Sequence, residues 1–264
     1  MSRLNANHER GRAAGPLEPE TDLSTETEAG RGAFTTTNWS VVAGARDPGS
    51  AEAQAALGRL CQTYWYPLYV FVRRQGHNPE DAQDLVQGFF AKLIEKNYVS
   101  GFERERGRFR SFLLVALKRY SAKEYVSARR EKRGGAREVI SLDAQDTEMR
   151  YRAEPVGALS PEKAYERQWA LTLLAQVLDR LAAEYGASGK SPVFDALKIF
   201  LSGEKGASYA EVGQLLRMSE GAVKVAVHRL RLRYRELLRL EIANTVSSDD
   251  AVEDEIRNLF AALS

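Results

Sequence analysis

Basic side chains recur with helical spacing near the C-terminal end of the chain. Residues 219–238 have an apolar period of 3.6 residues, which predicts a helix with one side facing a core. The opposite side carries Lys224, His228, Arg229 and Arg231. Side chains of this kind bind phosphate oxygens and base edges, so this pattern indicates contact with a nucleic acid.

A second, shorter helix is expected just before this basic helix. Ser208 and Glu211 have the spacing of a capping box, and Ser219 can cap the basic helix. A short helix, a turn over residues 217–219 and a longer basic helix form the pattern of a helix-turn-helix, whose second helix lies in the DNA major groove. The alternative is an ordinary helical hairpin with a solvated cationic face.

The net charge of +2 conceals three strongly charged segments. Residues 101–137 hold twelve Lys and Arg against four Asp and Glu, and residues 217–239 hold seven against two. Residues 240–264 hold one against six. Two basic segments in a nearly neutral chain favour two separate contacts with a polyanion.

The residues that could perform catalysis or bind metal do not form a known site. Gly189, Lys190 and Ser191 resemble the end of a phosphate-binding loop, but Glu184 stands where that motif requires glycine. The three histidines lie far apart in sequence, and the single cysteine, Cys61, excludes an internal disulfide. We expect no enzyme activity, no cofactor and no metal.

The elements that position these residues are expected to be helices, so the predicted fold class is all-α, with two helical domains. We expect a disordered tail at 1–33, a first domain at 34–135, a flexible linker at 136–160 and a helix-turn-helix domain at 161–240. An acidic extension with a short amphipathic helix follows at 241–264. No signal region and no membrane-spanning run is found, so we expect a cytoplasmic protein without membrane contact.

Several segments, taken in order, resemble a bacterial RNA polymerase sigma factor of the two-domain, extracytoplasmic-function type. In the first domain these are residues 66–71 (YPLYVF), 78–90 (NPEDAQDLVQGFF) and 107–113 (GRFRSFL). In the second they are residues 208–212 (SYAEV), 219–224 (SEGAVK) and 228–231 (HRLR). The likeness covers about residues 34–240 and implies that the chain binds core RNA polymerase and promoter DNA. An anti-sigma factor is a further partner that such a resemblance allows.

The resemblance also assigns roles to individual residues. It implies core polymerase binding by Asp81, Asp84 and Gln87. It implies contacts with the −10 promoter element by Arg108, Arg110, Lys118, Arg119 and Lys123. It implies contacts with the −35 element by Ser219, Glu220, Ala222, Lys224, His228, Arg229 and Arg231. The family usually has Trp, Asn and Asp at or near Phe112, Arg119 and Lys123, so the chain departs from the pattern there.

Two alternatives remain open at this point. The chain could be a stand-alone helix-turn-helix regulator that binds operators without polymerase, and the Asp/Gln face could be merely solvated. The acidic extension could fold back on a basic surface and modulate DNA binding, or it could be a plain helix that completes the second domain.

Overall fold

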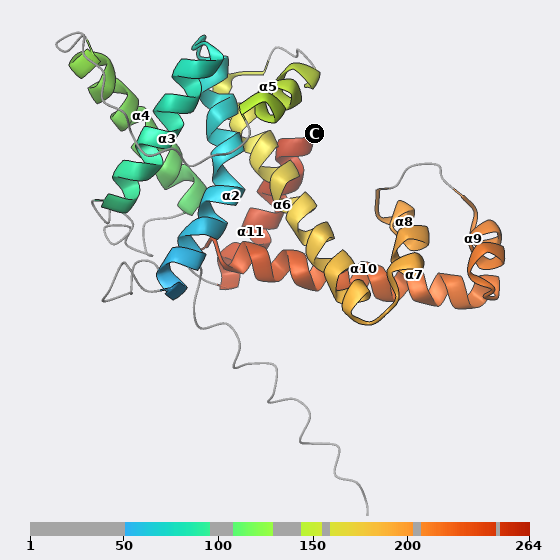
Figure 1. Ribbon diagram of the computed structural model, residues 1–264. Coiled ribbons are helices and arrows are strands. Elements are labelled where there is room, and N and C mark those ends of the chain that lie inside the picture. Colours follow the sequence, from blue (N-terminus) through green and yellow to red (C-terminus); the bar gives the residue numbers. More distant parts are fainter. Residues whose placement is uncertain (1–50, 96–107, 129–143, 155–158, 203–206, 247–248) are drawn as a thin grey trace, which may run out of the picture. The chain divides into compact units, whose positions relative to one another are not determined.

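The computed structural model describes residues 51–95, 108–128, 144–154, 159–202, 207–246 and 249–264 (Figure 1). The chain divides into residues 1–35 and 36–264, and every described residue belongs to the second unit. The predicted N-terminal tail lies outside the described residues. The helices are α2 (Ala51–Arg74), α3 (Pro79–Glu95), α4 (Phe109–Ala128), α5 (Ala144–Ala153), α6 (Pro161–Ala187), α7 (Ser191–Leu197), α8 (Ile199–Ser202), α9 (Tyr209–Leu216), α10 (Glu220–Ala243) and α11 (Asp249–Leu263).

The fold is all-α, as the sequence predicts, and the described residues contain no strand. Local signals place the helix starts. Asn78 caps α3 by accepting a hydrogen bond from the Asp81 backbone N–H at 2.8 Å, and Pro79 takes the first helical position, where no backbone N–H is needed. An apolar stripe runs along α3, and its buried members are Ala82, Val86, Phe89, Phe90 and Leu93.

The core of the described residues is centred on α2 and α6, which pack along one another (Figure 1). Tyr64 of α2 and Trp169 of α6 are fully buried, and Phe109 at the start of α4 meets Tyr64 edge to face at 5.5 Å. Helices of the two predicted domains therefore contact one another directly. The predicted domain boundaries stay a prediction.

Helix α5 lies inside residues 136–160, the segment predicted to be a flexible linker, so part of that segment is helical; the linker itself stays a prediction. The sequence of α5 offers no apolar stripe, because Met149 and Tyr151 are its only large apolar residues. Polar contacts hold it instead. Glu148 accepts a hydrogen bond from the Tyr69 hydroxyl at 2.6 Å and pairs with Arg73 at 3.0 Å, which fastens α5 to α2.

The helices that follow α6 are α7 to α11. Phe194 and Leu197 of α7 are buried, and α9 packs on both α7 and α10. The predicted last helix is present as α11, which packs on α6 and α10 and buries Val252 and Leu259.

Candidate nucleic-acid interface

The junction between α9 and α10 is built by two capped helix starts and a tight turn. Ser208 and Glu211 form the predicted capping box, with the Glu211 N–H bonded to Ser208 Oγ at 3.2 Å and the Ser208 N–H bonded to Glu211 Oε2 at 2.6 Å. Ser219 caps α10 by accepting from the Ala222 N–H at 3.2 Å. Both predicted caps are confirmed.

The turn between α9 and α10 depends on the backbone conformation of Arg217 and on the lack of a side chain at Gly213. Arg217 has φ 54°, in the left-handed region, and so ends α9. The Met218 N–H then bonds to the Gly213 carbonyl at 2.8 Å. A Cβ at Gly213 would lie 2.8 Å from the Met218 carbonyl oxygen, so a side chain there would push α9 and the turn that follows it apart.

The outer face of α10 carries five of the seven predicted −35 residues. Val223, Val227 and Leu230 are buried against the core, as the apolar period predicts. The opposite side is exposed over more than two turns. It carries Glu220, Lys224, Val225, His228, Arg229, Arg231, Leu232 and Arg235.

Five of the predicted −35 residues are partly buried or have a partner within the chain. Ser219 is the helix cap described above, and Ala222 is half-buried. Arg231 donates through Nη2 to the Phe200 carbonyl at 2.8 Å, which ties α10 to α8. Lys224 pairs with Glu220 at 2.7 Å, and this hydrogen bond raises the pKa of Lys224 above its ordinary value.

The predicted −10 residues do not form one open surface. Arg119 and Lys123 are exposed and line a cavity of about 350 Å³ between α3 and α4. The cavity is also lined by the aromatic rings of Phe112 and Tyr120. Cationic and aromatic groups at one opening are the combination that holds an unstacked base and its phosphate.

The other three predicted −10 cations are occupied by carboxylates from α6 and α11. Lys118 pairs with Glu162 at 2.7 Å, and this hydrogen bond lowers the pKa of Glu162. Arg108 pairs with Glu255 at 2.8 Å. Arg110 was expected to be a phosphate contact, but it is 4% exposed and is held by Glu255, so it lies out of reach of a phosphate in this conformation.

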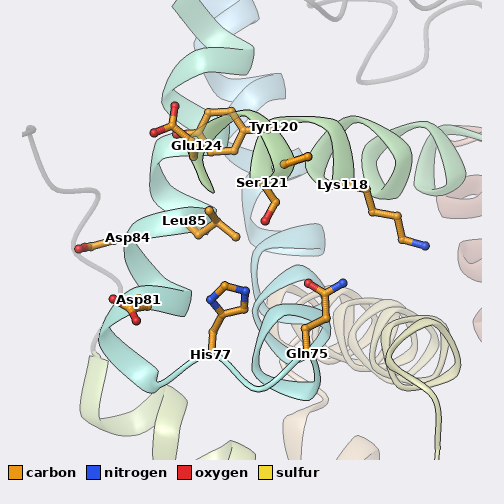
Figure 2. A pocket seen from close by; sticks show the side chains of 10 residues that line it. Gln75, His77, Asp81, Asp84, Leu85, Lys118, Tyr120, Ser121 and Glu124 are labelled. Carbon is orange, nitrogen blue, oxygen red and sulfur yellow. The ribbon is translucent and has the colours of Figure 1, made fainter. Parts of the chain in front are cut away.

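The residues implied in polymerase binding lie on α3. Asp81 and Asp84 are exposed on one side of a hollow of about 680 Å³, with His77 at the end of the α2–α3 turn and Lys118 on the opposite side (Figure 2). Gln87 is half-buried and does not line this hollow. Asp81, Asp84 and Gln87 follow one another at three-residue spacing on α3, so each is a helical neighbour of the next, and of the three only the aspartates line the hollow.

Sequence reasoning missed the carboxylates that meet the cations of α4. Glu162, Glu166 and Glu255 lie at least 44 residues away from their partners in the chain. The acidic balance of residues 240–264 was the one signal that pointed toward such contacts, and it did not single out Glu255.

In comparisons with protein-family models, with curated proteins and with solved structures, no match to the chain was found. Across the ranges that the structure describes, no helix has the length and apolar character needed to cross a membrane. Within the same ranges, no three His, Cys, Asp or Glu side chains gather in a way that could hold a metal ion.

Proposed function

We propose that the chain is a sigma factor, a subunit that binds core RNA polymerase and directs it to promoters without catalysing a reaction of its own. One observation carries the proposal: the capped α9, its left-handed turn and the exposed cationic face of α10. A turn of this length followed by a helix with an outward basic side is how the second helix of a helix-turn-helix enters the major groove. The sequence resemblance supports the same role.

The α3–α4 cavity supports a second promoter contact. Half-buried Phe112 and Tyr120 line the cavity, and exposed Arg119 and Lys123 line it beside them. Opening a promoter requires that unstacked bases of one strand be held, and stacking on aromatic rings next to cations does this for any base. In this proposal α10 binds the duplex upstream and the cavity binds the melted strand downstream.

Asp81 and Asp84 support the polymerase contact. Both are exposed on α3, and acidic groups around a hollow suit a basic partner surface. A stand-alone regulator would have no use for this surface. The double variant Asp84→Lys with Gln87→Ala therefore distinguishes the two functions. If the chain is a sigma factor, the unaltered protein binds core polymerase and the double variant does not. If it is a stand-alone regulator, neither protein binds core polymerase. Glu80→Lys, an exposed acid in the first turn of the same helix, is the matched charge control.

The deciding experiment is run-off transcription from genomic fragments with core polymerase, with and without this protein. New start sites that depend on the protein are expected. On those promoters Lys224→Ala should change the preferred −35 sequence, because Lys224 lies in the first turns of α10, where base edges are reached. Arg229→Ala should weaken binding to all sequences and lower the salt dependence, as loss of a phosphate contact does. An absence of new start sites on every template would refute the proposal.

A further inference from the structure

Helix α11 places a buried carboxylate against two cations at the start of α4. Glu255 is 1% exposed, and its carboxylate accepts from Arg110 Nε at 2.6 Å and from Arg108 Nε at 2.8 Å. A second donor of Arg110, Nη2, lies 3.3 Å from the same carboxylate. A carboxylate gripped in this forked manner takes the place that a phosphate would take, because both anions suit the guanidinium geometry.

Arg110 is buried, so its charge needs a carboxylate such as Glu255 beside it. Its guanidinium carbon lies 4.6 Å from the centre of the Trp169 ring, and Nη1 pairs with Glu166 at 2.9 Å. Burial alone would lower the pKa of Arg110, but the hydrogen bonds and charges of Glu255 and Glu166 raise it, so the group stays a cation. A buried cation needs an anion beside it, and α11 supplies one.

Helix α11 is attached by both apolar and ionic contacts. Val252 and Leu259 are buried, and Ala251, Ile256, Ala262 and Leu263 pack on the core while partly exposed, in addition to the ion pairs. Because a phosphate can replace the carboxylate at both guanidinium groups, a bound strand would offset the loss of these ion pairs when α11 leaves its site. Exposed Lys118 is neutralised in the same way by Glu162, so carboxylates occupy three of the five cations predicted to bind the −10 strand.

We propose that α11 is a built-in inhibitory helix, in which Glu255 withholds Arg108 and Arg110 from single-stranded DNA until α11 is displaced. The inference rests on the proposed function and concerns the regulation of its second DNA contact. A single strand binds only the open form at these two cations, so DNA and α11 compete, and DNA shifts the population toward the open form.

The test measures binding of a fluorescent single-stranded oligonucleotide over a range of salt concentrations. Glu255→Gln should bind the strand more tightly than the unaltered protein. Because two further cations become available, the slope of log affinity against log salt should become steeper by about 1.4. Glu253→Gln is the matched control: it removes the same charge from α11, but Glu253 is exposed and pairs with Arg239 instead of α4. Its slope should stay unchanged.

A second variant covers the case in which Glu255→Gln does not fold. Leu259→Ala keeps every charge and weakens only the apolar seat of α11, so it should also tighten binding. In the unaltered protein, amide hydrogens of α11 should exchange faster when the oligonucleotide is added. Folded variants that bind like the Glu253→Gln control, or α11 amides whose exchange DNA leaves unchanged, would overturn the inference. The proposed function fails separately, through an absence of new start sites in run-off transcription.

Discussion

One substitution made at two glycines should have opposite effects on stability. Gly213 is buried in α9, and a Cβ there would lie 2.8 Å from the Met218 carbonyl oxygen. Gly221 is exposed in the first turn of α10, and a Cβ there would meet nothing within 4 Å. Both glycines are helical, so replacement by alanine improves the helix propensity by up to about 1 kcal/mol at each.

The clash decides the sign at Gly213. The atom in the way belongs to the backbone, and the turn that holds it is closed by the hydrogen bond from the Met218 N–H to the Gly213 carbonyl. Forcing extra volume into such a place costs about 1–3 kcal/mol. Gly213→Ala should therefore lower the free energy of unfolding by up to about 2 kcal/mol, while Gly221→Ala should raise it by up to about 1 kcal/mol.

Urea denaturation at 25 °C, followed by far-ultraviolet circular dichroism, measures both changes. The difference between the two variants should be about 1–3 kcal/mol, which is large enough to resolve from the shift in midpoint at a constant slope. A Gly213→Ala protein as stable as Gly221→Ala would refute the reasoning, because it would mean that the turn between α9 and α10 tolerates a side chain at its closest point.

Three further predictions follow from other contacts. Burial raises the pKa of Cys61 from 9.0 to about 11, so at pH 8 the folded protein should hold about 100-fold less thiolate. Because a thiolate of higher pKa is more nucleophilic, the folded protein should react with a disulfide reagent about 10-fold more slowly than the urea-unfolded chain; equal rates would contradict this. Desolvation works against ionised Glu148, yet hydrogen bonds from Tyr69 and Arg73 hold its pKa below the ordinary 4.5. Glu148→Gln should therefore lose about 1–3 kcal/mol at neutral pH, and the gap to the unaltered protein should close as pH falls through the lowered pKa; denaturation at pH 7 and pH 3 tests this, and a gap that persists in acid would argue against it. Arg217→Gly should raise the melting temperature, because the left-handed backbone conformation costs a residue with a side chain about 1 kcal/mol and costs glycine almost nothing. A lower melting temperature would show that the Arg217 side chain stabilises the turn.

The sequence predicts best those features whose cause is local. The caps at Ser208 and Ser219 depend on residues three positions away, and each is confirmed. The burial of Val223 and Val227 follows from a period that is visible within two turns. Both kinds of feature could be predicted from neighbouring residues alone, because their partners lie within two turns of the same helix.

Features created by distant partners were out of reach. The neighbours of Arg110 are basic and suggest an exposed phosphate contact, but its burial depends on Glu255, 145 residues away. Helix α5 has no apolar period because its attachment is polar, through Glu148, and a pattern search for apolar stripes passes over such a helix. In both cases a charged side chain met its counter-ion only after the chain had folded.

The packing of α2 on α6 also has a consequence during synthesis. Thr63 and Gln176, hydrogen-bonded at 3.0 Å, are 113 residues apart in the chain. At a translation rate of about 5–20 residues per second, α2 is made roughly 6–23 s before the part of α6 that covers it. Throughout that interval Tyr64, Leu68 and Phe71, which are buried in the finished protein, lack their α6 partner. The nascent chain therefore exposes these apolar and aromatic side chains to solvent, where they can aggregate unless a ribosome-associated chaperone binds them.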